Sequence, residues 1–281
     1  MVDPVISLDG LGKRFGHTVA VNAISMTIAE GEIFGFLGAN GAGKTTTIRM
    51  LCGLTRSTRR HGTIHGLDIW ADRSRVRPQF GYVPQRFSLY ADLTVLENLR
   101  FFGCAYRVSR DRLRTRIETL LSELDLATKR DTEAGRLSGG FKQLLSISCA
   151  LIHEPSVLFL DEPTAGLDPV HRQHIWSLLY RLSRQGTTIF LTTHYMDEAA
   201  RCTDIGFIQG WSAYRKRFST RAETKFAKQA SGTSCERSYG WDGDTRWASR
   251  CLRSRVAQRS LANPCTGFGG ATEELARALA L

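Results

Sequence analysis

The segment GANGAGKTT, residues 38–46, constrains this chain more than any other part of its sequence. It has the form G-x-x-x-x-G-K-[ST], in which Gly38, Gly43, Lys44 and Thr45 occupy the defining positions. An apolar run, IFGFL, comes directly before it, and a stretch of helical periodicity, TTIRMLCGL, overlaps its end. A glycine loop between a buried strand and a helix lets backbone N–H groups surround phosphates. The segment therefore predicts a nucleotide-binding loop, with Lys44 on the β- and γ-phosphates and the Thr45 hydroxyl on Mg²⁺.

Composition and cysteine usage indicate a cytoplasmic protein. Of the 281 residues, 42% are hydrophobic and 23% are charged, and no apolar run is long enough to span a bilayer. The first residues, MVDPVISLDG, lack the basic start and apolar stretch of a secretory signal. The seven cysteines show neither a C-x-x-C pair nor metal-ligand spacing, which favours reduced thiols. We therefore expect a cytoplasmic chain with one large domain or two modest ones.

The net charge of +11 is unevenly distributed. Residues 211–281 hold 13 Lys or Arg against 6 Asp or Glu, a net of +7, which leaves +4 for the first 210 residues. A solvated basic tail explains this distribution at least as well as a nucleic-acid-binding face. We therefore expect no nucleic-acid partner.

Apolar periodicity along the chain alternates between strands and helices, which predicts an α/β fold with a parallel core sheet. Short alternating runs at residues 5–8 and 19–28 predict an antiparallel β subdomain at the N-terminus. Helical periodicity over residues 94–152 predicts an inserted helical subdomain at about residues 90–153. The other expected elements are a strand, the glycine loop and a helix over 32–54, strands at 80–85, 157–163, 187–194 and 204–209, and a helix at 170–184.

Two adjacent carboxylates end the fully apolar stretch VLFLDEP, residues 157–163. Successive strand residues point to opposite faces, so Asp161 and Glu162 cannot share one role. Asp161 fits the metal position of P-loop NTPases. Glu162 is then the candidate that orients or deprotonates the attacking water. Without the glycine loop these two residues would be read as the polar end of a core strand.

A second glycine-rich turn occurs at LSGGFKQ, residues 137–143, about 94 residues after the first. Its Lys142 does not follow the glycines as a phosphate-binding lysine would. Ser138, Gly139 and Gly140 precede an apolar-periodic helix, so free N–H groups and a positive dipole meet there without large side chains. By itself this pattern is equally typical of an ordinary helix start capped by serine.

The order and spacing of these motifs resemble the ATP-binding subunit of an ABC transporter over roughly residues 5–209. In this resemblance Gln85 falls at the Q-loop, LSGGFKQ is the signature, AGLD at residues 165–168 is the D-loop, and His194 is the switch histidine. The resemblance implies a P-loop NTPase cassette over residues 1–210 that binds ATP and Mg²⁺. It also implies that the signature acts on ATP held by a second chain in a head-to-tail dimer.

The resemblance assigns residues to three roles. The catalytic residues are Lys44, Gln85, Glu162 and His194. The metal ligands are Thr45, Gln85 and Asp161. The nucleotide-contacting residues are Phe15, Gly38, Asn40, Gly41, Gly43, Lys44, Thr45, Thr46, Ser138, Gly139, Gly140, Gln143 and Asp168.

Several of these residues have a simpler structural interpretation. Phe15 is either the aromatic residue that stacks on adenine or a strand-end aromatic in the core. Gln85 taken alone would be a surface amide, and a lone histidine such as His194 at a strand end is usually structural. Asp168 is expected to cap the helix that begins after Pro169, as well as to reach across the dimer.

Separate permease subunits are implied as partners, because no segment of this sequence is expected to cross a membrane. Residues 86–102, RFSLYADLTVLENLRFF, lie where the family receives a coupling helix of the permease, although core packing would also explain their apolar content. The sequences of the motifs are most similar to those of ABC-2 type exporters of drugs, antibiotics, lipids or polysaccharides. The resemblance therefore places the chain at the inner face of the cell membrane.

Two stretches depart from the family pattern. Residues 56–64, RSTRRHGTI, are more basic than the turn usual there, although Gly62 preserves a turn residue. After about Gln209 the family continues with a short hairpin and a closing helix, whereas residues 211–281 are basic and lose apolar periodicity. We expect a poorly ordered tail and hypothesise that it is an out-of-frame reading of a once ordinary C-terminus. The alternative is a divergent basic tail ending in a short amphipathic helix at 271–281.

Two other functions compete with export. One is a soluble ABC-type ATPase acting on ribosomes or DNA, but such proteins usually carry two cassettes in one chain or a long coiled coil within the cassette, and neither occurs here. The other is an assembly-impaired remnant, because of the atypical C-terminus. The intact motif residues argue against decay of the site itself.

Overall fold

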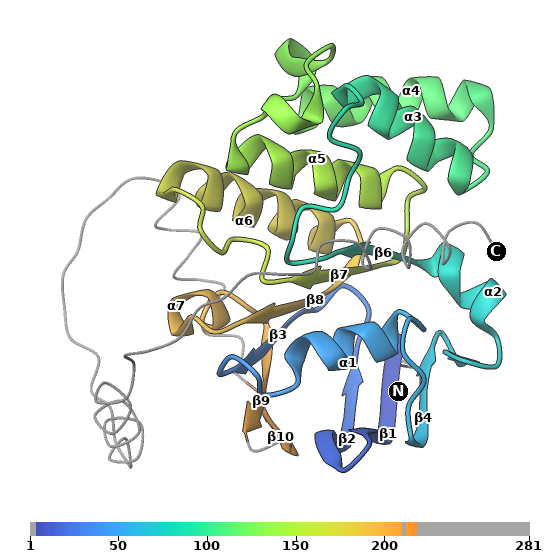
Figure 1. The fold of residues 1–281 in the computed structure, drawn as a ribbon, viewed down its shortest axis with the longest axis vertical. Coiled ribbons are helices and arrows are strands. Elements are labelled where there is room, and N and C mark those ends of the chain that lie inside the picture. Colours follow the sequence, from blue (N-terminus) through green and yellow to red (C-terminus); the bar gives the residue numbers. More distant parts are fainter. Residues whose placement is uncertain (1–3, 210–211, 218–281) are drawn as a thin grey trace. The chain divides into compact units, whose positions relative to one another are not determined.

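The computed structural model describes residues 4–209 and 212–217, which form two β-sheets with helices around them (Figure 1). One sheet has four strands in the order β2-β1-β4-β5, and the other has six in the order β10-β9-β3-β8-β7-β6. The predicted α/β class, with an antiparallel N-terminal sheet and a largely parallel core sheet, is confirmed.

The four-stranded sheet is antiparallel, and its strands come from the segments before and after the glycine loop. Its strands are β1 (Ile6–Phe15), β2 (Thr18–Ile28), β4 (Arg59–Ile64) and β5 (Leu67–Asp68). The strand β4 lies within the basic stretch after the first helix. There Gly62 pairs with Leu8 of β1 inside the sheet, so the expectation that Gly62 forms a turn is wrong. The chain instead turns between Ile64 and Leu67.

The six-stranded sheet positions the functional motifs. Its parallel strands are β3 (Ile33–Gly38), β6 (Phe80–Val83), β7 (Val157–Asp161), β8 (Thr188–Thr193) and β9 (Asp204–Gln209). Because parallel strands share a direction, all their carboxyl ends lie at one edge of the sheet. The strands β3, β7 and β8 are almost entirely buried, as expected for parallel strands covered on both faces.

Helices cover the central sheet and join it to the antiparallel sheet (Figure 1). The helix α1 (Lys44–Leu51) contacts β2, β3 and β7, and α6 (Pro169–Arg184) packs on β3 and β8. The short helix α2 (Arg73–Val76) contacts β5, and α7 (Met196–Ala199) contacts β3 and β8. One hydrophobic cluster connects the two sheets through α1, with Phe34, Phe36, Phe159 and Phe190 at the central sheet.

The predicted helical subdomain consists of α3 (Val95–Ala105), α4 (Arg110–Glu123) and α5 (Gly139–Leu151), which lie together away from the antiparallel sheet in Figure 1. The start of α3 is set by a capping box between Thr94 and Glu97. The buried amide of Asn98 donates to the carbonyls of Tyr90, Leu93 and Thr94, which holds the preceding loop against the helix. The helix α5 also contacts β6 and therefore connects the subdomain to the core sheet.

Six residues of the predicted tail form the strand β10 (Ser212–Arg217), which pairs antiparallel with β9 from Ser212–Gln209 to Arg217–Asp204. The edge hairpin that the sequence was expected to lack is therefore present. The rest of the tail, with its hypothesised change of reading frame and the predicted helix at 271–281, lies outside the described residues. In the part of the chain that the structure describes, no helix has the length and apolar character to cross a bilayer.

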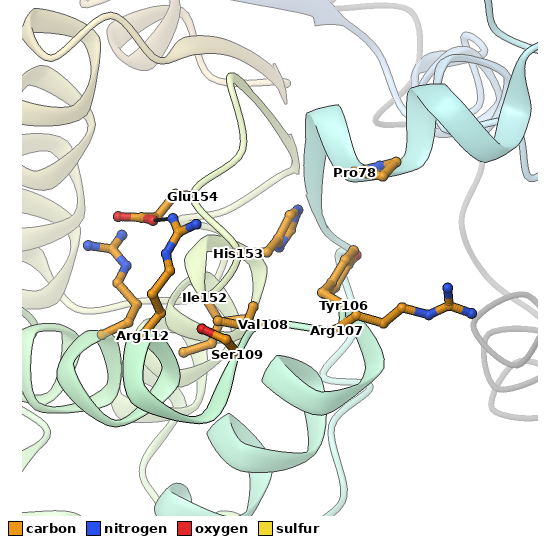
Figure 2. Close-up of a pocket in the computed structure, with 10 residues that line it drawn as sticks. Pro78, Tyr106, Arg107, Val108, Ser109, Arg112, Ile152, His153 and Glu154 are labelled. Carbon is orange, nitrogen blue, oxygen red and sulfur yellow. Dashed lines mark hydrogen bonds and ion pairs between the residues drawn. The ribbon is translucent and has the colours of Figure 1, made fainter.

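A pocket of about 310 Å³ lies where the segments before β6, after α3 and after α5 meet (Figure 2). In it the rings of Tyr106 and His153 stack, with centroids 3.7 Å apart and planes 5° from parallel. His153 Nε2 lies 3.1 Å from the carbonyl oxygen of Phe80, so this nitrogen carries the proton. Burial lowers the pKa of His153 to about 4.

We predict that His153 makes the stability of the folded chain rise with pH between about 4 and 6.5. In this window the unfolded state binds a proton that the folded state excludes, so the stabilisation is complete above pH 6.5 and is lost as the pH falls toward 4. The loss amounts to at most about 3 kcal/mol. It is measured as the difference in free energy of unfolding in urea between the wild type and His153→Gln at pH 4.5, 5.5 and 7.

His153→Gln keeps an amide donor for the Phe80 carbonyl but does not titrate, so the stability of the wild type should fall relative to that of the variant as the pH is lowered. His17→Gln, at an exposed histidine in the β1–β2 turn, is the matched control and should follow the wild type. A difference between wild type and His153→Gln that is the same at all three pH values would contradict the prediction.

Candidate active site

The glycine loop between β3 and α1 is fixed by its backbone conformation. Gly43 caps α1 with a φ of 106°, and a Cβ atom there would lie 2.4 Å from the carbonyl oxygen of Ala20 in β2. Only glycine fits this position, which holds the loop against the antiparallel sheet. No side chain caps the start of α1 and its first turn holds no acidic residue, so its N–H groups are available to an anion. Thr45 and Thr46 lie half-buried in this first turn.

The side chain of Lys44 extends back over the glycine loop. Its Nζ donates to the carbonyl oxygens of Gly38, at 2.8 Å, and Ala39, at 3.2 Å. The same nitrogen lies 3.2 Å from Oε1 of Glu162, and the two side chains are only 5% and 8% exposed. The predicted phosphate-binding lysine and the predicted catalytic carboxylate are therefore in direct contact. The tip of the loop, at Asn40, is exposed.

Asp161 and Glu162 have different surroundings, as expected, but for a different reason. The strand β7 ends at Asp161, and Glu162 adopts a left-handed backbone with φ of 51°. This conformation is uncommon for a residue other than glycine and turns the Glu162 side chain out of the strand. The hydroxyl of Thr192 donates to Asp161 Oδ1 at 2.6 Å, and its oxygen accepts the N–H of Glu162 at 3.0 Å.

Three motifs that are distant in the sequence meet at the Glu162 carboxylate. The amide nitrogen of Gln85 donates to Oε2 at 3.0 Å, and His194 Nδ1 lies 3.2 Å from the same oxygen. Lys44 contacts the other oxygen. All four predicted catalytic residues therefore form one contiguous cluster at the carboxyl edge of the sheet. Such a cluster places three polar side chains around the carboxylate, and a general base must be positioned in this way.

A free carboxylate oxygen beside this cluster fits a metal ion. Asp161 is 1% exposed, and its Oδ2 is buried with no hydrogen-bond partner among the described residues. A buried anionic oxygen without a partner is costly, and Mg²⁺ prefers hard oxygen ligands. Gln85 meets Glu162 through its nitrogen, which leaves its amide oxygen for a metal. The predicted ligands Thr45, Gln85 and Asp161 therefore have the chemistry that Mg²⁺ requires.

The signature turn lies apart from this cluster. Ser138 is the N-cap of α5, yet its hydroxyl makes no capping hydrogen bond. The alternative of an ordinary serine-capped helix start therefore does not describe this turn. Within residues 4–209 and 212–217, no hydrogen bond or ion pair connects Ser138, Gly139 or Gly140 to Lys44 or Glu162. Gln143 lies half-buried just after the first turn of α5.

Phe15 ends β1 and is 54% exposed, so the alternative of a core aromatic is wrong. Lys13 Nζ lies 4.9 Å from the centroid of its ring. An exposed aromatic face at the end of the hairpin that contacts Gly43 suits a planar base.

Asp168 caps α6, as expected. Its Oδ1 accepts the N–H groups of Val170 and His171 at 3.0 and 3.1 Å, and Oδ2 lies 2.6 Å from His171 Nδ1. These hydrogen bonds lower the pKa of Asp168.

Sequence reasoning missed two supporting residues. Thr192, described above, orients both carboxylates. Glu198, in α7, is 2% exposed and accepts hydrogen bonds from the hydroxyls of Thr164 and, at 2.7 Å, Thr193. It thus ties the segment before the D-loop to the end of β8 next to His194. A threonine pair before the histidine and an acidic residue after it were the only signals available in the sequence.

Comparisons with known proteins point to one family. The family model for "ABC transporter" matches residues 21–165. The probable multidrug ABC transporter ATP-binding protein YbhF of Escherichia coli (strain K12) is 40% identical over 206 residues, covering 73% of this chain and 36% of that protein. The Nod factor export ATP-binding protein I of Rhizobium sp. (strain N33) is 44% identical over 199 residues, covering 71% and 66%. The chain thus spans about a third of one relative's length and about two-thirds of the other's.

Solved structures show the same architecture. An ATP-binding subunit of an ABC transporter superposes with a TM-score of 0.71 at 27% identity, covering 82% of this chain and 95% of that one. A dimeric ATP-binding cassette in a post-hydrolysis state, bound to ADP and Pi, superposes with a TM-score of 0.69 at 25% identity, covering 76% and 99%. The predicted cassette fold is therefore confirmed.

We predict that Thr192→Val lowers the free energy of unfolding by about 1–3 kcal/mol, because Asp161 stays buried but loses its hydroxyl donor. The change is close to isosteric and is measured by urea denaturation at pH 7. Thr187→Val is the matched control, because the half-buried side chain of Thr187, which directly precedes β8, makes no hydrogen bond among the described residues. Equal losses in the two variants would contradict the role of the Thr192 hydroxyl.

Proposed function

The chain belongs to the ABC transporter family, and we propose that it is the ATP-hydrolysing subunit that powers export through separate membrane permeases. One observation carries this proposal: Lys44, Gln85 and His194 converge on the carboxylate of Glu162 at the end of β7. A buried carboxylate with three polar partners adds little to the stability of a fold, since apolar residues stabilise such a position equally well. This arrangement therefore favours a functional role over a purely structural one.

In the proposed reaction, the glycine loop and the start of α1 bind the phosphates of ATP, and Lys44 neutralises the β- and γ-phosphate oxygens. Mg²⁺, held by Thr45, Gln85 and Asp161, would neutralise charge that develops on the transferred phosphoryl group. Glu162 orients the attacking water or accepts its proton, a contribution of about 10²–10⁴-fold in rate. His194, whose Nδ1 lies 3.2 Å from Glu162 Oε2 without a hydrogen bond to it, is close enough to contact that carboxylate and the γ-phosphate together.

We propose that two copies of the chain bind ATP between them, head to tail. Support comes from the start of α5, where an uncapped serine and two glycines present free N–H groups that no phosphate loop of the same chain contacts in the described residues. Each copy then supplies the glycine loop of one site and the signature turn of the other. Asp168, at the start of α6, faces the same shared site in this arrangement.

The permease is proposed to dock on the segment after Gln85. Residues 86–102 divide into two parts: Val95, Leu99 and Phe102 are buried in the subdomain, whereas Tyr90 and Phe101 are each 41% exposed. The rings of Tyr90 and Phe101 contact each other edge to face, with centroids 4.7 Å apart. An exposed aromatic pair of this kind suits a protein interface better than plain core packing.

The relatives named for multidrug and Nod factor export suggest an exporter. The sequences of the motifs suggest the ABC-2 type, with drug, antibiotic, lipid or polysaccharide substrates. The chain would then work at the cytoplasmic face of the cell membrane, attached through the permease.

We predict that Glu162→Gln binds Mg-ATP but hydrolyses it at least about 10²-fold more slowly than the wild type, because the water loses its base. The trapped nucleotide should hold two copies together. Light scattering should therefore report a mass near 31.3 kDa without nucleotide and about twice that value with Mg-ATP.

Lys44→Ala, which removes the phosphate contact, is the control and should neither bind ATP nor dimerise. A Glu162→Gln protein that binds ATP but stays monomeric would overturn the two-chain site. Undiminished hydrolysis by Glu162→Gln would overturn the role of the carboxylate.

A further inference from the structure

His171 lies between the two elements that the chain is proposed to present to a second copy. It occupies the first turn of α6, directly after the D-loop, and its side chain is 26% exposed. Its Nδ1 donates to Asp168 Oδ2 at 2.6 Å, while Asp168 Oδ1 accepts the backbone N–H groups of Val170 and His171. The carboxylate is therefore held by the backbone, and it fixes the orientation of the imidazole ring.

The other side of the ring covers the signature turn. A Cβ atom built on Gly140 would lie 2.2 Å from Cδ2, 2.3 Å from Cγ and 2.6 Å from Nε2 of His171. These distances are far below van der Waals contact, so the ring sits directly on the Gly140 backbone and leaves no room for a side chain. Phe141 adds an edge-to-face contact with the same ring, at 5.5 Å between centroids.

A second D-loop residue lies close to the signature turn beside the ring. A Cβ atom on Gly139 would lie 3.8 Å from Cδ2 of Leu167, the D-loop residue before Asp168. Gly139 and Gly140 thus each meet one residue from the start of α6. The signature turn and the D-loop are packed together although about 28 positions separate them in the sequence.

We propose that His171 is a positioning residue that holds the signature turn and the D-loop as one unit. The inference rests on the proposed two-chain site, in which this unit acts on the nucleotide bound by the other copy. The hydrogen bond to Asp168 fixes the ring, and the ring fixes Gly140. A shift of either element relative to the other would move the signature N–H groups away from the partner's γ-phosphate.

Two variants separate the contributions of His171. His171→Asn keeps a donor near the Nδ1 position but removes the ring, whereas His171→Phe keeps a ring against Gly140 but cannot donate to Asp168. Both should lower kcat, and His171→Ala should lower it most, by roughly tenfold or more, because the signature turn then loses both contacts. Binding of a fluorescent ATP analogue to the monomer should stay within about twofold of wild type, because His171 does not touch the glycine loop of its own chain. Full ATPase activity in His171→Ala would overturn the proposal.

Mixing His171→Ala, which has a low rate, with the inactive Lys44→Ala identifies the chain on which His171 acts. His171→Ala has an intact glycine loop, and Lys44→Ala has an intact signature turn and D-loop. A mixed pair therefore contains one site in which both halves are intact. The mixture should exceed the rate of either variant alone and approach at most about a quarter of the wild-type rate, the value for random pairing in which half of the pairs are mixed and half of their sites are intact. No recovery would show that His171 acts within its own chain and would overturn the proposal.

A control mixture separates failure of this inference from failure of the proposed function. Ser138→Arg blocks the signature turn directly, and mixing it with Lys44→Ala must restore activity if two copies share a site. Recovery in this control without recovery for His171→Ala rejects the role of His171 alone. If neither mixture recovers, the two-chain site itself is rejected, and the inference with it. His171→Asn mixed with Lys44→Ala repeats the test with a variant that retains the Asp168 hydrogen bond.

Discussion

The contact between Lys44 and Glu162 is the interaction on which the rest of the site depends. Both side chains are almost fully buried, and their charged atoms lie 3.2 Å apart. Buried ion pairs add little net stability compared with apolar residues, but removing one partner leaves an uncompensated charge that costs about 3–5 kcal/mol. The pair therefore ties the glycine loop to the end of β7, and Gln85 and His194 complete the surroundings of the carboxylate.

The parallel sheet makes this convergence possible. The strands β3, β6, β7 and β8 all end at one edge, so the residues that follow them meet without long connections. The local backbone adds what the sheet alone does not supply. The left-handed conformation of Glu162 turns its carboxylate toward Lys44, while Asp161 stays in the strand and points its free oxygen elsewhere. Thr192 holds both residues from the neighbouring strand.

The other half of the proposed machinery depends on packing between helices. The start of α5 is left uncapped, and the start of α6 is capped by Asp168. His171 joins the two starts, because its ring lies on Gly140 and its nitrogen binds Asp168. One part of the chain thus forms a cluster around Glu162, and a separate part packs the starts of α5 and α6 together through His171. This division is consistent with the proposal that the two glycine-rich turns serve different sites.

The sequence alone determined the features that depend on local chemistry. The glycine loop, the acidic strand end, the signature turn and the capping role of Asp168 were all predictable, because each needs particular residue types at fixed spacing within one segment. Tertiary structure decided the rest: Gly62 lies in a strand, residues 212–217 close an edge hairpin, and Thr192, Glu198 and His171 support the site. These outcomes depend on contacts between segments that are distant along the chain. The sequence pattern of one segment does not specify which other segment it will pack against, so it cannot predict these contacts.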